Sequence, residues 1–144
     1  MDLVTAIRSE HVRLEEDLAE LEGTVRSPDV AEFKRRAGIF GADLLGHAQL
    51  EDELLFGPLE PSLGTGAGPL SAMRADHDRI ENGLAQLRQT PDIAQAKAML
   101  AETAEVVRDH FQREEMLFAM AGELLDQDRL SQLGSQWIEK RPPR

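Results

Sequence analysis

Apolar residues recur along most of the chain at alternating spacings of three and four positions. Side chains with this spacing lie on one face of an α-helix, so each series predicts an amphipathic helix with a buried seam. The four seams, with the polar residues that fall on them, are Val4, Ile7, His11, Leu14, Leu18 and Leu21; Val30, Phe33, Ala37, Phe40, Leu44, His47, Glu51 and Leu54; Leu70, Met73, His77, Ile80, Leu84 and Leu87; and Met99, Thr103, Val106, His110, Glu114, Leu117 and Ala121. The pattern predicts four helices, and it carries the histidines and two glutamates inward with the apolar residues.

Glycine and proline residues punctuate the first half of this pattern. Gly23 is expected to end the first helix, and Ser27–Pro28–Asp29 is expected to supply an N-cap with proline at the first helical position. The second helix should continue to about Phe56, where Gly57–Pro58 stops it. Residues 57–69, which contain several glycines and prolines, are expected to form a loop or crossover.

The second half of the chain is punctuated in the same way. Thr90–Pro91–Asp92 is expected to be another N-cap and helix start, so the third helix ends near Gln89 and the fourth begins almost at once. A fifth, shorter helix is expected from about Glu123 to Trp137, packed on the outside of the others. Residues 141–144 are expected to form a frayed tail, which leaves residues 1–140 as a single domain.

The two halves of the chain also repeat each other. The segment His11–Leu21 matches His77–Leu87, and the segment His47–Asp52 matches His110–Glu115. Two helix hairpins of the same layout would pack around a pseudo-twofold axis. The fold expected from the sequence is therefore all-α, an up-down four-helix bundle with a short additional C-terminal helix.

Composition and charge exclude several classes of function. The chain has 144 residues and no cysteine, which rules out disulfides, thiolate metal sites and cysteine nucleophiles. A net charge of −11 argues against binding to nucleic acid. No stretch approaches the roughly 20 apolar residues of a membrane span, and the start of the chain lacks the basic and apolar regions of a signal peptide. A soluble, cytoplasmic protein without nucleic-acid or membrane partners is expected.

Every histidine in the chain is followed four residues later by a glutamate: His11 and Glu15, His47 and Glu51, His77 and Glu81, and His110 and Glu114. Residues at i and i+4 project from the same face of a helix, so each pair can converge on one point. A single histidine on an apolar seam is more often a hydrogen-bonded core residue than a ligand. Four such pairs, one on each helix, form an inward cluster of acids and imidazoles that needs a cation to neutralise it. Imidazole and carboxylate ligands suit iron, manganese or zinc better than magnesium or calcium, and the repeat suggests two ions.

The acids in these pairs are not equivalent. Glu51 and Glu114 lie on their seams and could bridge two ions, which would leave the four histidines as terminal ligands. Glu81 could add one further oxygen ligand, and Glu15 has an equal claim by symmetry but an equally good interpretation as a surface acid. Glu115 is a further uncertain acid. Other acids near the pairs are interpreted as solvated groups or as partners that orient a ligand ring: Glu16, Asp17, Glu53, Asp76, Asp78 and Asp109.

Together, the single histidines on the first and third helices and the His-x-x-x-Glu pairs on the second and fourth resemble the haemerythrin-like, or HHE cation-binding, domain family over about residues 3–120. The resemblance implies a four-helix bundle that encloses a di-iron site bridged by carboxylates and an oxo or hydroxo group. Its ligands here would be His11, His47, Glu51, His77, Glu81, His110 and Glu114. Zinc or manganese would be a less fitting occupant.

The chain departs from the pattern of oxygen-carrying haemerythrins at two places. Those proteins have His-x-x-x-His on the third helix and His-x-x-x-x-Asp on the fourth, where this chain has Glu81, and Glu114 with Glu115. A charged oxygen donor in place of an imidazole favours ferric iron, which works against reversible oxygen carriage. If Glu81 does not bind, the second iron has an open position for a small ligand.

Three hypotheses of function follow. The first is a di-iron protein that binds, senses or reacts with O2, peroxide or NO, with catalase-like or peroxidase-like turnover as one activity that the resemblance allows. The second is an iron storage or iron delivery and repair protein, although the chain lacks the cysteine-containing segment that repair-type relatives often carry. The third is a structural or interaction bundle held by zinc or by no metal. The sequence leaves open the native metal, the protein partner and the oligomeric state.

Overall fold

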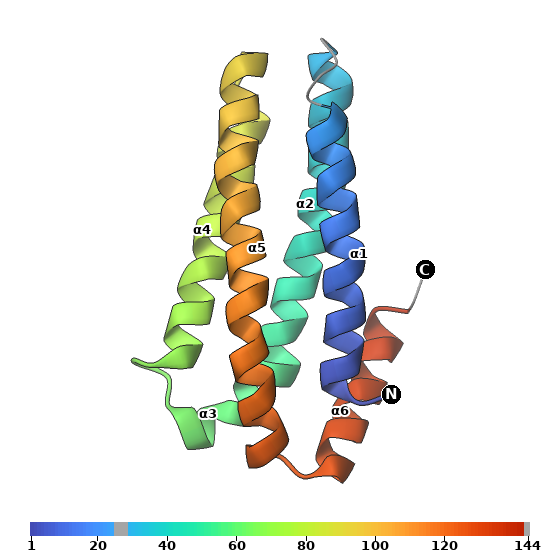
Figure 1. Ribbon diagram of the computed structural model, residues 1–144, viewed down its shortest axis with the longest axis vertical. Coiled ribbons are helices and arrows are strands. Elements are labelled where there is room, and N and C mark those ends of the chain that lie inside the picture. Colours follow the sequence, from blue (N-terminus) through green and yellow to red (C-terminus); the bar gives the residue numbers. More distant parts are fainter. Residues whose placement is uncertain (25–28, 143–144) are drawn as a thin grey trace.

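The computed structural model describes residues 1–24 and 29–142, and within these residues all regular structure is helical. The long helices run side by side along the longest axis of the molecule (Figure 1). In chain order the elements are α1 (Leu3–Thr24), α2 (Val30–Glu51), the π-helix η1 (Asp52–Phe56), α3 (Gly57–Leu63), α4 (Pro69–Gln89), α5 (Ile93–Leu124) and α6 (Gln127–Lys140). The pair α1 and α2 and the pair α4 and α5 form the two hairpins, which confirms the expected all-α bundle with its additional C-terminal helix. No helix in the described residues is long and apolar enough to cross a membrane.

Aspartates lie at the starts of several of the helices and cap them. The side chain of Asp29 accepts a hydrogen bond from the backbone N–H of Glu32, and Asp92 accepts one from the N–H of Ala94, so these aspartates are the N-caps of α2 and α5. The N-cap expected within Thr90–Pro91–Asp92 is thus supplied by its aspartate, while the backbone N–H of Thr90 bonds to Gln86 and ends α4 at Gln89, as expected. Asp126 caps α6 in the same manner. Ser27 and Pro28, the other residues of the first expected cap, lie outside the described residues.

The stop predicted at Gly57–Pro58 is absent, and the helical path continues to Leu63. The backbone N–H of Gly57 bonds to the carbonyl of Asp52, five residues back, which is the spacing of a π-helix. Pro58 is tolerated because it falls in the first turn of α3, where a helix does not need its N–H. The helix ends only at Gly64, whose φ of 78° favours glycine.

The apolar interior consists of two clusters, one toward each end of the bundle. The first includes Ile7, Leu54, Phe56, Met73, Leu117 and Trp137. The second includes Leu14, Leu44, Ile80, Val107 and Phe111. On α1, α2 and α4 the histidine falls between residues of the two clusters, and on α5 Glu114 does, so the polar side chains form a layer that separates the clusters.

Helix α6 begins later and lies closer to the bundle than the sequence predicted. It starts at Gln127 rather than near Glu123, and Trp137 is only 1% exposed. A Cβ atom at Gly134 would lie 2.3 Å from the carbonyl oxygen of Met1, so the absence of a side chain lets α6 approach the start of α1. Arg141, expected in a frayed tail, pairs through its guanidinium with acids of the bundle. Residues 143–144 lie outside the described residues.

Candidate metal centre

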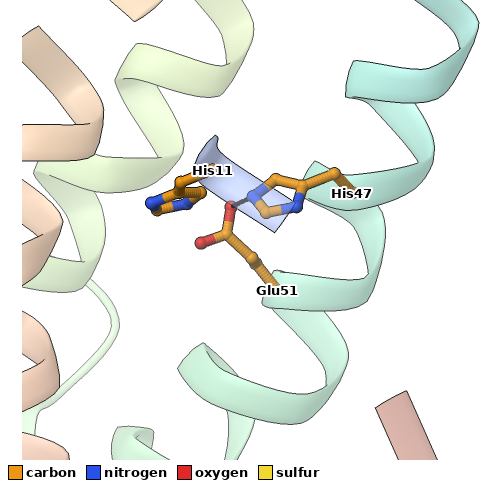
Figure 2. A group of neighbouring side chains, drawn as sticks. All are labelled: His11, His47 and Glu51. Atoms are coloured by element: carbon orange, nitrogen blue, oxygen red, sulfur yellow. Dashed lines mark ion pairs between the residues drawn. The ribbon is translucent and has the colours of Figure 1, made fainter. Parts of the chain in front are cut away.

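The four histidines meet in the layer between the two apolar clusters, one from each of α1, α2, α4 and α5. His11, His47 and His110 are buried, and the side chain of His77 is 12% exposed. Each long helix brings its histidine to the same level because the seams of the two hairpins have matching register. Figure 2 shows His11 and His47 turned toward the carboxylate of Glu51.

Two groups of possible ligands share one carboxylate. In each group the ligand atoms lie within 4.8 Å of one another. The first group is His11, His47 and Glu51, and the second is Glu51, His77 and His110. The Oε1 atom of Glu51 lies 2.9 Å from Nε2 of His47 and 3.5 Å from Nε2 of His77. Glu51 therefore joins a histidine of its own hairpin to a histidine of the other.

Glu114 makes the symmetric connection. Its Oε2 atom lies 3.2 Å from Nε2 of His110, on its own helix, and 3.4 Å from Nε2 of His11, across the bundle. These two imidazoles come one from each of the two groups. The two glutamates thus occupy equivalent positions around the pseudo-twofold axis.

Several of the buried polar atoms have no hydrogen-bond partner among the described residues, 1–24 and 29–142. Both carboxylate oxygens of Glu51 and both of Glu114 are in this state, as are Nε2 of His11 and Nε2 of His47. Although Glu51 and His47 are close, their atoms do not align as a donor and an acceptor. Unpartnered buried carboxylates are costly, but the same lone pairs are what a metal ion requires. The residues present therefore fit a cation.

Aromatic side chains surround the histidines. The ring of His11 stacks on Phe111 with 3.9 Å between centroids and 10° between planes. The His47 ring meets the Trp137 ring edge-on at 5.4 Å, and the His77 ring stacks on Phe56 at 5.5 Å. These contacts restrict the rotation of the imidazoles and exclude water from the layer.

Two further acids accept hydrogen bonds from the Nδ1 atoms of two histidines. Nδ1 of His47 donates to Glu10 at 3.2 Å, and Nδ1 of His110 donates to Asp76 at 3.0 Å. A donated Nδ1–H leaves Nε2, which faces the centre, as the atom with a free lone pair. Asp76 thus fits the hypothesis that a neighbouring acid orients a ligand ring.

Glu10 was not among the residues expected at the site, although the sequence contains a signal for it. Glu10 immediately precedes His11, and Asp76 immediately precedes His77. In each hairpin the acid before one histidine accepts a hydrogen bond from the other histidine. Extending the internal repeat by one residue toward the N-terminus would have found the pair.

The histidines of the first group differ in electrostatic surroundings. Burial lowers the pKa of His11 to about 4, and the nearby charge of His47 adds to this effect. Burial also opposes protonation of His47, but the carboxylates of Glu51 and Glu10 outweigh it and raise its pKa to about 9. The pKa of Glu51 is correspondingly far below its usual value, because His47 outweighs the effect of burial on the carboxylate. His110 resembles His11, since burial lowers its pKa.

The structure keeps the remaining candidate acids away from this layer. Glu15 and Glu81 are exposed, so Glu81 does not join the group that contains His77. The side chain of Glu115 is 49% exposed and pairs with Arg8 at 2.6 Å. A cavity of about 10 Å³ instead adjoins His77, His110 and Glu51. Its other walls are mostly apolar and are formed by Leu44, Leu45, His47, Ala48, Ile80 and Phe111.

Comparison with protein families places this geometry in a known class. A family model described as the Hemerythrin HHE cation binding domain matches residues 2–121. The chain belongs to this family, a class of helical bundles that bind metal cations. Searches of curated proteins and of solved structures found no match. Helix α6 lies beyond the matched residues.

Proposed function

We propose that the protein binds two iron ions and that the loaded centre binds or reacts with O2, peroxide or NO. His11 and His47 would hold one ion, His77 and His110 would hold the other, and Glu51 and Glu114 would span both. The observation that carries this proposal is the position of Glu51, whose carboxylate belongs to both ligand groups and has no hydrogen-bond partner of its own.

The donor set favours iron. Each ligand group offers two imidazoles and one carboxylate, the combination that non-haem iron uses in sites with open positions. When bound there, iron would supply one-electron chemistry toward O2, peroxide or NO. The protein's own contribution is to hold Nε2 of His47 and of His110 toward the centre, through Glu10 and Asp76, and to exclude water with the aromatic rings.

The size and lining of the cavity support a small ligand. A volume of about 10 Å³ is close to that of one water-sized molecule, and the apolar walls suit an uncharged ligand. The second ligand group, beside this cavity, lacks Glu81, so its ion would keep a position free for the ligand. The burial of Glu51 and Glu114, both 0% exposed, disfavours the alternative of iron delivery, because release would require the bundle to open.

The first experiment measures metal per chain after loading with Fe²⁺ without oxygen. About two irons are expected for the wild type. Glu51→Gln should lose most of the metal, whereas Glu15→Gln and Glu81→Gln, which change exposed acids of the same i+4 relationship, should retain it. Zinc alone, or equal losses in all three variants, would contradict the proposal.

A second experiment follows the visible absorption of the loaded protein on addition of O2, H2O2 or NO. We expect a spectral change with at least one of them. Leu45→Phe should slow it by filling the cavity while leaving every ligand-group residue unsubstituted. If the loaded protein reacts with none of the three, the proposed metal binding would stand and the proposed reactivity would be refuted.

A further inference from the structure

Helix α6 reaches the metal centre although it lies outside the residues that the family model matches. Trp137 donates its Nε1–H to Oε2 of Glu10 at 2.8 Å, and Arg141 pairs with Oε1 of the same carboxylate. Glu10 in turn accepts from Nδ1 of His47, whose Nε2 faces Glu51. A continuous series of polar contacts therefore connects α6 with the candidate ligands.

We propose that Glu10 is a positioning residue for His47 and that α6, by holding Glu10, makes metal binding and the docking of α6 energetically coupled. This inference rests on the proposed metal-binding function. Loss of the contacts of Trp137 and Arg141 should therefore weaken metal binding. In turn, bound metal should make α6 open less often.

The contacts of Glu10 explain why α6 is needed. Glu10 is 8% exposed, so its carboxylate has lost most of its water and requires donors from the protein. His47, Trp137 and Arg141 are hydrogen-bond donors to it, and two of these three come from α6 or the residue after it. Arg13, on the same helix as Glu10, adds only a longer ion pair, with 3.5 Å between its Nη2 and Oε1 of Glu10. Without the donors from α6 the carboxylate would turn toward solvent, and His47 would lose the partner that keeps Nε2 directed inward.

Helix α2 leaves room for the residue that follows α6. A Cβ atom at Gly46 would lie 2.7 Å from Nη1 of Arg141, so the glycine leaves the space that the guanidinium fills. Arg141 also pairs with Asp43 on α2, and Lys140 pairs with Glu53 at 2.6 Å. The end of α6 is therefore attached to the hairpin that carries His47.

The other half of the centre supplies an internal comparison. Asp76 accepts from His110, but its second donor is Arg113, at 2.5 Å, which lies on the same helix as His110. This half is supported within the four-helix bundle. The coupling to α6 is thus specific to the half that contains His47.

The test uses the full chain and Co²⁺, whose absorption bands report the number and kind of ligands. We expect Glu10→Ala to weaken Co²⁺ binding about 10- to 100-fold, the usual effect of removing a partner of a ligand histidine. Glu10→Gln should recover part of the loss, because its amide oxygen can still accept from His47. Trp137→Phe, which keeps an aromatic ring but lacks the N–H, should weaken binding as well.

The matched control is Glu22→Gln, on the same helix as Glu10. It also removes an acid paired with an arginine, since Glu22 pairs with Arg108 across the bundle. This variant should bind Co²⁺ like the wild type. Equal affinities of Glu10→Ala and Glu22→Gln would overturn the inference while leaving metal binding intact, whereas a wild type that takes up no Co²⁺ would overturn the proposed function itself. If Glu10→Ala does not fold, Glu10→Gln and Trp137→Phe decide the matter.

Hydrogen exchange supplies a readout that a merely structural contact would not change. Because coupling between two events is reciprocal, Co²⁺ should slow amide exchange in residues 127–140 of the wild type, and this effect should shrink in Trp137→Phe. Exchange in α6 that is the same with and without Co²⁺ would overturn the coupling.

Discussion

His47 and His11 face the same carboxylate from different electrostatic surroundings. With a pKa of about 9, His47 carries a proton at neutral pH when no metal is bound, whereas His11, with a pKa of about 4, is neutral. In the metal-free protein the charge on His47 lies between the carboxylates of Glu51 and Glu10, and Glu10 is also paired with Arg141. A metal ion must displace this proton, because only the deprotonated imidazole is a ligand.

Metal affinity should consequently depend on pH. The proton on His47 is held below pH 9, so apparent affinity should rise by about tenfold per pH unit from pH 6.5 to 8.5 and level off above 9. Co²⁺ titrations at several pH values, with proton release followed by a dye at pH 7.5, would measure this. Release of about one proton per chain is expected, and an affinity that is constant over this range would refute the assignment of His47 as a ligand.

Glu114 allows binding and stability to be separated. Its carboxylate is 0% exposed, has no hydrogen-bond partner and lies between two imidazoles whose pKa values are lowered. Replacing a buried ionic group with an apolar one of similar shape is often stabilising. Glu114→Met should therefore raise the free energy of unfolding of metal-free protein by about 1–3 kcal/mol while abolishing most metal binding.

Urea unfolding in the presence of a chelator, together with metal analysis, tests this prediction. The control is Glu115→Met, one residue further along α5, where the side chain is exposed and its change should alter stability by less than about 0.5 kcal/mol. A large loss of stability in metal-free Glu114→Met would mean that Glu114 serves the fold rather than a metal.

At the scale of helices, glycine positions decide how closely elements pack. A Cβ atom at Gly134 would collide with backbone atoms of Met1, Asp2 and Leu3, which cannot move away as a flexible side chain could. Gly134→Ala should lower the free energy of unfolding by about 1–3 kcal/mol. Gly122→Ala, in a helix with nothing near its Cβ, should instead raise it by about 0.5–1 kcal/mol. Thermal unfolding of both variants would measure the contrast, and equal effects would show that α6 does not pack as described.

The seams found in the sequence were sufficient to locate the four long helices, because a helix that buries one face needs regularly spaced apolar residues. They also brought His47, Glu51 and Glu114 inward, as the structure shows. The register along η1 could not be obtained in this way. A π-turn adds one residue, so Leu54, Leu55 and Phe56 are buried in succession, and no helical seam has that pattern.

The contacts of α6 with the site could not be predicted from the sequence either. Trp137 and Arg141 lie more than a hundred residues from Glu10 in the chain, and only tertiary packing joins them. The ligand role expected for Glu81 also rested on local spacing alone. The i+4 rule brings it to the same face as His77, but the side chain lies on the solvent side of the seam.

In the molecule as a whole, the polar layer crosses the interface between the two hairpins and interrupts the apolar interior. The apolar clusters on either side can hold the bundle together without metal. The contacts within the layer cross between hairpins, since Glu51 faces His77 and Glu114 faces His11. A bound ion would therefore connect α1 and α2 to α4 and α5.

Removing metal should thus lower stability without unfolding the protein. Metal that binds only the folded chain stabilises it by about 2.7 kcal/mol when its free concentration is 100 times the dissociation constant. We expect the thermal midpoint to fall on chelation while helical circular dichroism at 25 °C is retained, and to recover when metal is restored. Glu51→Gln should show little difference with and without metal, because the carboxylate shared by both ligand groups is lost. A wild-type midpoint that does not respond to metal would place the ions elsewhere than between the hairpins, since an ion that joins both halves of the bundle must be released before they separate.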